Sequence, residues 1–343
     1  MQPIVTPLLQ WYAAAKRDLP WRGSPTPYGV WISEIMLQQT RVSAVKDYYV
    51  RWMAALPTVA DLAAAPSDLL HKLWEGLGYY SRVANLQRAA RQIMNDFGGE
   101  LPHTVEGLRS LAGIGDYTAG AIASIAYGLP VPAVDGNVLR VLARLTDDYT
   151  DVLSPEAKRR ATALLAPLIP RDRASDFTQA MFELGALVCL PRRPDCIACP
   201  LRAQCAAYAA GTQDELPVRV VKTRRRTVDV TVLVLSTPSG YVVTRPRDKG
   251  LLSGLYGLPF VEARLSPEDV PAAATEWGVF ATHVTPLPDA THVFTHVTWR
   301  LSGYLVGCTV DALPEGCMLA TAEDVRDRLA LPTAFAAYRP YLT

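Results

Sequence analysis

The sequence predicts a mainly α-helical N-terminal domain followed by a separate α+β C-terminal domain. Up to about Gly211, apolar residues recur at three- and four-residue spacing, which is typical of amphipathic helices. From Thr227 the apolar residues alternate with a period of two, which is typical of strands. Residues 211–226, GTQDELPVRVVKTRRR, are polar and end in basic residues, so we interpret them as a linker. The predicted domains therefore span residues 1–210 and 227–343.

Helical periodicity and helix-end signals define the elements of the first domain. Gly98-Gly99 and Gly128 are expected to end helices, and Ser154 is expected to cap a helix that begins with Pro155. The expected helices span residues 28–38, 41–55, 67–75, 80–97, 117–127, 136–145, 155–168 and 174–188.

The C-terminal domain shows strand patterns that are interrupted by turn signals. Residues 228–235, VDVTVLVL, and 240–246, GYVVTRP, flank the turn sequence TPSG. Residues 292–306, HVFTHVTWRLSGYLV, repeat the strand pattern, and residues 321–330 are expected to form a helix. Strands combined with a helix predict an α+β domain.

Charge is distributed unevenly between the two parts of the chain, although the net charge is only +1. Residues 1–226 carry 26 Lys and Arg against 21 Asp and Glu, whereas residues 227–343 carry 8 against 12. A mildly basic first part is compatible with a polyanionic partner, but charge alone does not identify one.

No apolar run approaches the roughly 18 residues that a membrane helix needs. The first residues, MQPIVTPLLQWYAAAKRD, also lack the basic and apolar regions of a secretion signal. We therefore expect a globular cytoplasmic protein with no membrane partner.

Four of the six cysteines, Cys189, Cys196, Cys199 and Cys205, form a compact group with the spacing C-x6-C-x2-C-x5-C. In a chain without a secretion signal this grouping predicts a metal site and not disulfides. Four thiolates suit both zinc and iron–sulfur centres, and the spacing alone does not choose between them. The residues between these cysteines include prolines and arginines, which predict a rigid basic loop: Pro191, Arg192, Arg193, Pro194, Pro200 and Arg202.

A glycine turn, LAGIG at residues 111–115, lies between two expected helices. Gly113 and Gly115 permit a tight turn, after which the first backbone N–H groups of the next helix can bind a phosphate without reading base sequence. The alternative is a turn that only connects the two helices.

Glu34 lies in the apolar helical segment WISEIMLQQT. It shares a helix face with Val30, Trp31, Leu37 and Gln38, so we expect its carboxyl to be partly desolvated and its pKa to be raised. A carboxyl in that state can act as a general acid. The alternative is an acid on a solvated helix face.

Asp135 precedes the helical segment GNVLRVLARL, so it could simply cap that helix. A carboxylate at a helix N-terminus also tends to stay ionised, because the helix dipole and local N–H groups stabilise its charge. One protonated and one ionised carboxyl group form the pair that glycosidic cleavage requires, and cleavage of an N-glycosidic bond follows the same logic.

Several motifs together resemble the endonuclease III superfamily of DNA glycosylases. LAGIGDYTAGA resembles its helix–hairpin–helix, here about residues 108–127, VDGNVLRVLARL resembles the segment with its essential Asp, and the cysteine spacing resembles its [4Fe-4S] loop, here 189–205. Within the superfamily, LPWR, WISEIMLQQTRV and GLGYYSRVANL are similar to adenine DNA glycosylases of the MutY kind. The resemblance implies a helical glycosylase core with an iron–sulfur loop, followed by a Nudix-like C-terminal domain.

The resemblance also implies roles for individual residues. Glu34 would protonate N7 of a flipped adenine, and Asp135 would stabilise the oxocarbenium ion at C1′. Tyr117 and Asn137 would position that ion and the attacking water. Bifunctional relatives have a lysine at the position of Tyr117, and only an amine can form a Schiff base with the sugar. The resemblance therefore implies a monofunctional enzyme that leaves an abasic site.

The remaining assignments concern DNA contacts. Gln39, Thr40 and Tyr79 would enter the duplex and fill the gap left by the extruded base. Trp21 and Arg22 would form part of the base pocket. In the C-terminal domain, the F-S-H loop of the family corresponds to Phe294, Thr295 and His296, which the resemblance implies would check the opposite strand for 8-oxoguanine.

We find no REXXEE-type acidic helix for magnesium, so the C-terminal domain is expected to read DNA and not to hydrolyse nucleotides. The resemblance implies a nucleoid-associated base excision repair enzyme, expected to be a monomer, that removes adenine paired with 8-oxoguanine or guanine in duplex DNA. The alternatives are a glycosylase for mispaired thymine or oxidised pyrimidines, and a non-catalytic iron–sulfur DNA-binding or redox module.

Overall fold

The computed structural model describes residues 4–23, 25–220, 225–246, 251–252 and 254–343. The chain forms two compact units, one made of Met1–Ala64 and Ala84–Val221 and the other of Ala65–Val83 and Lys222–Thr343. This division differs from the sequence-based one in a single segment, residues 65–83, which joins the C-terminal unit. The predicted linker, 211–226, stays a prediction, and its residues 221–224 lie outside the described residues.

The first unit is helical, and the expected helices are found within three residues of their expected ends. Ser154 caps the helix that begins with Pro155, since its side chain accepts a hydrogen bond from the N–H of Ala157. The helices assigned largely to this unit are α1 (Val5–Ala15), α2 (Pro27–Leu37), α3 (Val42–Ala55), α4 (Val59–Ala64), α6 (Ser81–Asp96), α7 (Val105–Arg109), α8 (Asp116–Ile125), α9 (Gly136–Leu145), α10 (Pro155–Leu165), α11 (Ala174–Leu187) and α12 (Ala206–Ala210), with short 3-10 turns η2 (Ala166–Leu168) and η3 (Arg202–Gln204).

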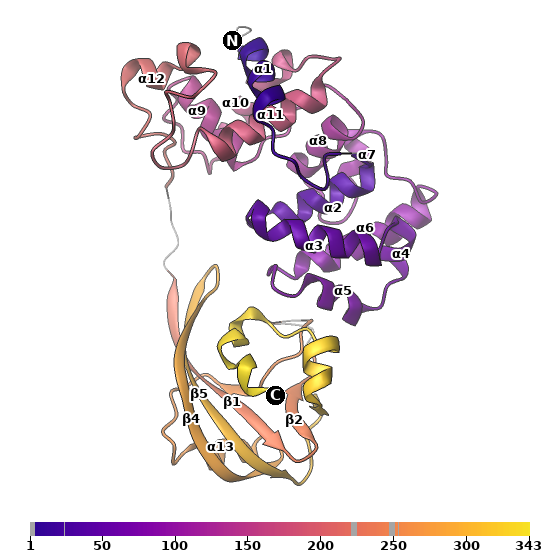
Figure 1. Ribbon diagram of the computed structural model, residues 1–343, viewed down its shortest axis with the longest axis vertical. Helices are drawn as coiled ribbons and strands as arrows, with labels where there is room; N and C mark the ends of the chain where they lie inside the picture. Colours follow the sequence, from indigo (N-terminus) through magenta and orange to yellow (C-terminus); the bar gives the residue numbers. More distant parts are fainter. Residues whose placement is uncertain (1–3, 24, 221–224, 247–250, 253) are drawn as a thin grey trace. The chain divides into compact units, whose positions relative to one another are not determined.

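Helices α1, α9, α10 and α11 share one core, in which α1 and α9 pack on α11 and α10 packs on α9. Figure 1 shows these four helices at one end of the first unit. Leu8 from α1, Val138 from α9 and Phe177 from α11 are almost completely buried there. Periodicity did not identify α1, α4, α7 and α12, and three of these are only five or six residues long.

The second unit contains a mixed sheet in the order β4-β5-β1-β2-β6, with β3 paired to β1. Strands β1 and β5 are parallel, and the other pairs are antiparallel. The elements are α5 (Ser67–Trp74), β1 (Arg226–Thr237), β2 (Gly240–Thr244), β3 (Phe260–Val261), α13 (Val270–Thr275), β4 (Val279–Val293), β5 (Val297–Val310), β6 (Cys317–Ala320), the π-helical turn η4 (Asp324–Arg328) and the 3-10 helix η5 (Thr333–Tyr341).

Both faces of the sheet are covered, which explains the nearly continuous apolar run in β1. Val232 packs on one face with Phe335 of η5, whereas Leu233 packs on the other face with Val270 of α13. Figure 1 shows η5 and α13 against the sheet. The predicted α+β class of the C-terminal domain is confirmed.

Two local predictions in this unit are confirmed in outline, and the structure adds detail to each. Residues 292–306 were expected to show the strand pattern, and they lie in β4 and β5, with the chain turning at 294–296, where the resemblance places its loop. Alternation continues through the turn, so the pattern does not mark it. Residues 321–330 were expected to form a helix, and they contain one, which is largely π-helical at η4. The N-terminal part of β4 was missed because Pro286 argues against a central strand, whereas β4 lies at the sheet edge, where proline is tolerated.

Candidate active site

Helix α2 places Glu34 inside the first unit. The helix begins with a side-chain cap, because Thr26 Oγ1 accepts a hydrogen bond from the N–H of Gly29 at 3.0 Å, and Pro27 occupies the first helical position. Every residue from 28 to 36 is buried, and Glu34 itself is only 5% exposed. The alternative of a solvated helix face is therefore wrong for this residue.

Burial raises the pKa of Glu34 to about 7. The hydroxyl of Tyr117 donates a hydrogen bond to Oε2 of Glu34, which favours the charged form and lowers the pKa. The negative charge of Asp135 raises the pKa, and the positive charge of Arg22 lowers it. Desolvation is the largest of these effects, so the direction agrees with the prediction from the apolar helix face.

Asp135 caps α9, as its position before the helix predicted. Its side chain accepts hydrogen bonds from the N–H of Val138 at 2.8 Å and from Nδ2 of Asn137 at 2.7 Å. Gly120 of α8 allows the preceding segment to approach closely, because a Cβ there would lie 2.2 Å from the carbonyl oxygen of Pro132. Close packing of α8 on this segment thus fixes where Asp135 emerges.

The sequence prediction did not include the desolvation of the Asp135 carboxyl. Burial raises the pKa of Asp135, although the hydrogen bonds from Val138 and Asn137 and the charge of Arg140 lower it. The expectation that the helix terminus alone keeps this carboxyl ionised was therefore incomplete, because desolvation opposes the cap.

Asn137 is held in a fixed orientation. Its Oδ1 accepts a hydrogen bond from Nη2 of Arg140 at 2.9 Å, while its Nδ2 donates to Asp135. Arg140 also donates to the carbonyl oxygens of Gly185 and Cys189, each at 2.8 Å. These contacts leave Asn137 little rotational freedom beside Asp135.

One cavity of about 160 Å³ brings most of the predicted catalytic and base-pocket residues together. The predicted residues that line it are Trp21, Arg22, Glu34, Thr40, Tyr117, Asp135 and Asn137. They come from widely separated parts of the sequence, and no spacing rule would have placed them around one space.

The sequence interpretation missed an ion-pair group in the same cavity. Glu183, which is 1% exposed, accepts hydrogen bonds from Nε and Nη2 of Arg17, at 2.5 Å at the shortest, and from Nη2 of Arg22 at 2.8 Å. Burial would raise the pKa of Glu183, but the two guanidinium groups outweigh it and the pKa is lowered. An acid flanked by apolar residues, in AMFELGAL, was the available signal, as it was for Glu34.

Aromatic rings provide the apolar surface of the cavity. The ring of Phe182 lies 5.8 Å from that of Tyr117, and the ring of Trp21 lies 5.4 Å from that of Tyr49, edge to face. Flat, apolar walls combined with a few carboxyl and guanidinium groups suit a planar heterocyclic ligand.

The glycine turn forms a hairpin between α7 and α8. Gly113 has a φ of +75°, and a Cβ there would lie 2.7 Å from Cβ of Asn85, so glycine is required at this position. Gly115 is the N-cap of α8 and provides no side-chain cap to its first N–H groups. That arrangement suits a phosphate at the helix N-terminus.

Gln39 lies beyond the C-terminus of α2 with a left-handed backbone, at a φ of 58°, and its side chain is exposed. Tyr79 has a φ of 47° in the second unit and is 47% exposed. Non-glycine residues adopt this conformation at an energetic cost, and residues strained in this way occur preferentially at functional sites.

The four cysteines of the 189–205 loop line one cavity together with Arg144. Nη1 of Arg144 donates a hydrogen bond to Sγ of Cys189 at 3.3 Å and another to the carbonyl oxygen of Leu190 at 2.7 Å. Within the described residues, no three Cys, His, Asp or Glu side chains are arranged to hold a single metal ion. Thiols that face a common space beside a cation form a donor set that suits an iron–sulfur cluster.

The second unit carries a groove of about 590 Å³ at the turn between β4 and β5. Phe294, Thr295 and His296 line it together with residues 76–81, and all of these belong to the same unit. The hydroxyls of Tyr79 and Thr295 are hydrogen-bonded at 3.1 Å. The structure thus gathers the predicted residues of the C-terminal loop around Tyr79.

Comparison with known proteins identifies the family. Residues 32–167 match the model of the HhH-GPD superfamily base excision DNA repair proteins. The chain is 34% identical to the human adenine DNA glycosylase over 97% of its own length and 73% of the relative. It is 38% identical to the adenine DNA glycosylase of Arabidopsis thaliana over 76% of this chain and 48% of the relative, and thus spans about half of that protein.

Solved structures agree on the helical fold. A thermostable thymine-DNA glycosylase matches with a TM-score of 0.55 at 27% identity, over 61% of this chain and 96% of that chain. A non-covalent endonuclease III–DNA complex matches with a TM-score of 0.52 at 24% identity, over 62% of this chain and 99% of that chain, which shows the fold alone. Among the described residues, no helix combines the length and apolar character needed to cross a membrane. The chain belongs to the adenine DNA glycosylases, within the HhH-GPD superfamily of base excision DNA repair proteins.

Proposed function

We propose that this protein excises adenine paired with 8-oxoguanine, or with guanine, from duplex DNA. The observation that carries the proposal is the convergence of Glu34 and Asp135 on one cavity, in which burial raises the pKa of Glu34 to about 7. A carboxyl group with that pKa is substantially protonated near neutral pH and can act as a general acid.

The proposed reaction begins with proton transfer from the carboxyl of Glu34 to N7 of the flipped adenine. The glycosidic bond between C1′ and N9 then breaks, and its electron pair leaves with the base. The negative charge of Asp135 stabilises the positive charge that develops at C1′. Water attacks C1′, forms the new C1′–O bond and releases its proton to solvent, which leaves an abasic site.

Three further residues assist in this scheme. Tyr117 donates to Glu34 and keeps its carboxyl oriented, while Asn137 donates to Asp135 and fixes that carboxylate. Arg22 donates a hydrogen bond to Glu183 in the cavity wall and contributes positive charge near Glu34. Each contact limits motion of a reacting group, which lowers the entropy cost of reaching the transition state.

The proposed enzyme is monofunctional. Strand cleavage through a Schiff base needs an amine, and the phenol of Tyr117 cannot supply one. The described residues that line the cavity include no lysine.

Recognition of the opposite base is assigned to the groove of the second unit. The ring of Phe294 lies 4.5 Å from that of His292 and 5.0 Å from that of Trp299, so the 294–296 turn packs against β4 and β5. The Thr295 hydroxyl lies within hydrogen-bonding distance of Tyr79, so the threonine that replaces the family serine keeps a polar contact in this groove. These features support a reader of 8-oxoguanine.

Backbone contacts to DNA are assigned to the hairpin of Gly113 and Gly115, while Gln39, Thr40 and Tyr79 are proposed to fill the gap in the duplex. The left-handed backbones of Gln39 and Tyr79 support that role, because residues held in this strained conformation cluster at functional sites.

The cofactor proposed for Cys189, Cys196, Cys199 and Cys205 is a [4Fe-4S] cluster. These residues would supply four thiolate ligands, and bound cluster would cross-link the loop to the core beside α9. Thiolate-to-iron absorbance in the visible range, lost on Cys199→Ser, tests this assignment against colourless zinc.

A glycosylase for thymine in T:G pairs is the nearest alternative. The solved thymine-DNA glycosylase is matched over 96% of its length by 61% of this chain, so that match leaves much of this chain, more than a third, without a counterpart. The presence of a second unit with a lined groove favours the adenine assignment. A non-catalytic DNA-binding module would not need two carboxyl groups in one cavity.

The experiment is a panel of end-labelled duplexes that carry adenine opposite 8-oxoguanine, adenine opposite guanine, thymine opposite guanine, or an oxidised pyrimidine. We expect cleavage of the adenine strands only after alkali treatment. If the adenine strands stayed intact after alkali treatment, the proposal would be wrong. Strand cleavage without alkali would contradict the monofunctional assignment.

A further inference from the structure

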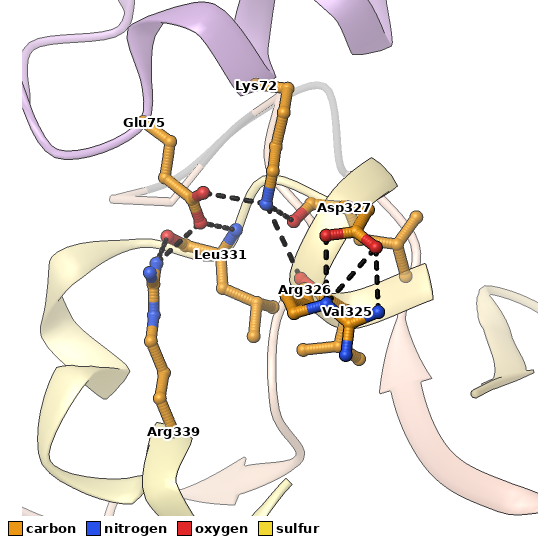
Figure 2. A network of polar contacts seen from close by, with 8 residues as sticks. Lys72, Glu75, Val325, Arg326, Asp327, Leu331 and Arg339 are labelled. Carbon is orange, nitrogen blue, oxygen red and sulfur yellow. Dashed lines mark hydrogen bonds and ion pairs between the residues drawn. The ribbon is translucent and has the colours of Figure 1, made fainter. Parts of the chain in front are cut away.

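Glu75 lies at the centre of a polar network that joins the α5 segment to the C-terminal fold within the second unit (Figure 2). Its Oε1 accepts hydrogen bonds from the N–H of Leu331 at 2.9 Å and from Nη2 of Arg339 at 2.6 Å. Its Oε2 is paired with Nζ of Lys72 at 2.8 Å. The side chain of Glu75 is only 13% exposed, so these partners replace most of its hydration.

The partners of Glu75 are themselves fixed. Nζ of Lys72 donates to the carbonyl oxygen of Leu329 at 3.2 Å, and Arg339 also donates to the carbonyl oxygen of Leu331. Figure 2 shows Lys72 and Glu75 pointing from α5 toward the segment that contains η4 and η5. The carboxylate thus bridges two stretches of chain more than 250 residues apart in sequence.

The residues directly after Glu75 form an unusual turn. Gly76, Gly78 and Tyr79 all have left-handed backbones, with φ values of 101°, 68° and 47°. For Tyr79 this conformation is unfavourable, and it persists only where the surroundings enforce it. The turn is therefore a segment whose shape depends on its anchors.

Several contacts hold the far part of the turn. Nε1 of Trp74 donates to the carbonyl oxygen of Gly78 at 3.0 Å, and Nη2 of Arg82 donates to the same oxygen at 3.0 Å. The hydroxyl of Tyr79 meets that of Thr295 at 3.1 Å across the groove. At the beginning of the turn, the Glu75 network attaches the chain to η5, whose first residues also line the groove.

We propose that Glu75, paired with Arg339, is a positioning residue that sets the enzyme's preference for the base opposite adenine. It does so by fixing the 76–79 turn, and with it Tyr79, against the β4–β5 turn that carries Thr295. This inference rests on the proposed function, since it concerns the same groove. Glu75 itself lies outside the residues that line the groove, so it acts through the turn.

The first test compares single-turnover excision of adenine opposite 8-oxoguanine with excision opposite guanine, in the full-length protein. Glu75→Gln keeps the shape of the side chain but removes the charge that holds Lys72 and Arg339. We expect the ratio of the two rates to fall by roughly tenfold, which corresponds to about 1.4 kcal/mol of lost discrimination. An unchanged ratio, or an equal loss on both substrates, would overturn the inference.

Matched variants separate positioning from general loss of stability. Arg339→Met should reduce the ratio as Glu75→Gln does, Arg339→Lys should retain most of it, and the double variant should be no worse than either single one, because both act through one contact. Asp289→Asn breaks the exposed ion pair with Arg264 in the same unit and should leave the ratio unchanged. Additive losses in the double variant would contradict the shared contact.

The second test needs no substrate. Hydrogen exchange of the backbone amides of residues 76–80 in the DNA-free protein should be roughly tenfold faster in Glu75→Gln than in the wild type, and unchanged in Asp289→Asn. Equal exchange in all three proteins would show that Glu75 does not hold the turn. If the wild type excised no adenine, the proposed function would fail, while hydrogen exchange would still decide whether Glu75 fixes the turn.

Discussion

The hydroxyl of Tyr117, in the first turn of α8, donates a hydrogen bond to the carboxyl of Glu34 on α2. This contact joins the helix that follows the hairpin to the helix that carries the proposed acid. Burial raises the pKa of Glu34, and the Tyr117 hydrogen bond limits that rise because it stabilises the charged form. Burial and this hydrogen bond act in opposite directions, and the resulting pKa of Glu34 is about 7.

This relationship predicts a pH dependence. Glu34 must be protonated to act as an acid, so the single-turnover excision rate should decline as pH rises through about 7. Tyr117→Phe removes a contact that lowers the pKa, so the decline should begin at a higher pH in this variant. Rate profiles from about pH 5 to about pH 9 for both proteins provide the measurement. A Tyr117→Phe profile displaced toward lower pH would contradict the assignment.

Glu34→Gln should reduce the excision rate by about 10²–10⁴-fold, because the amide cannot donate a proton as a carboxylic acid does. Affinity for an uncleaved duplex should change little, since the shape and volume of the side chain are conserved. Single-turnover kinetics and gel-shift titration on the same duplex check the two parts. Full activity in this variant would identify the protein as something other than the proposed enzyme.

Glu34→Gln should also change the free energy of unfolding, in a direction that the raised pKa of Glu34 defines. The pKa of Glu34 is raised from 4.5 to about 7 in the folded state, so between these values the folded state binds more protons than the unfolded state. The contribution of Glu34 to the free energy of unfolding therefore falls as pH rises through that range and levels off above it. Above pH 7, Glu34→Gln should be more stable than the wild type by roughly 3 kcal/mol, while the difference should shrink toward pH 4. Urea unfolding at several pH values measures this, and a constant difference would contradict it.

Glu183→Gln should destabilise the first unit. Glu183 is buried between Arg17 and Arg22, so loss of its charge leaves two guanidinium groups without their carboxylate. We expect a loss of roughly 3 kcal/mol in the free energy of unfolding, at the lower end for a broken buried pair because both arginines retain some exposure.

Asp176→Asn is the matched control for that variant. Asp176 lies on the same helix, α11, and its ion pair with Arg173 is exposed, so its loss should cost less than about 1 kcal/mol. If urea unfolding showed that both substitutions lower the free energy of unfolding equally, the buried ion pairs of Glu183 would be no more stabilising than the exposed pair.

Local patterns were sufficient to predict much of the helical unit. Ser154 was expected to cap a helix that begins with Pro155, and that helix is found where the sequence predicts it. The apolar helix face of Glu34 indicated its burial, because burial of one helical residue follows from its neighbours at three- and four-residue spacing, but its role as an acid was inferred only with the family resemblance.

Relations between distant segments could not be predicted in this way. Arg17 and Glu183 are 166 positions apart, and neither has a local signature that names the other. The association of residues 65–83 with the C-terminal unit likewise depends on partners such as Leu331 and Arg339. The burial of Asp135 was missed for the same reason, since its cap is a local feature whereas its desolvation depends on packing around the cavity.

Two substitutions at Asp135 should separate its structural role from its catalytic one. Asp135 accepts from the N–H of Val138 and thereby caps α9, and asparagine can make the same contact, since both are favoured N-caps. Asp135→Asn should therefore keep the free energy of unfolding within about 1 kcal/mol of the wild type. It should nevertheless abolish measurable excision, because a neutral amide cannot stabilise positive charge at C1′.

Asp135→Ala removes both the cap and the charge. It should be equally inactive and also less stable than Asp135→Asn by about 1 kcal/mol, the usual cost of losing a side-chain cap. Urea unfolding and single-turnover excision on the same preparations give both quantities. If Asp135→Asn retained activity while Asp135→Ala lost it, the cap and not the charge would be the contribution of Asp135, and the two-carboxylate mechanism would have to be abandoned.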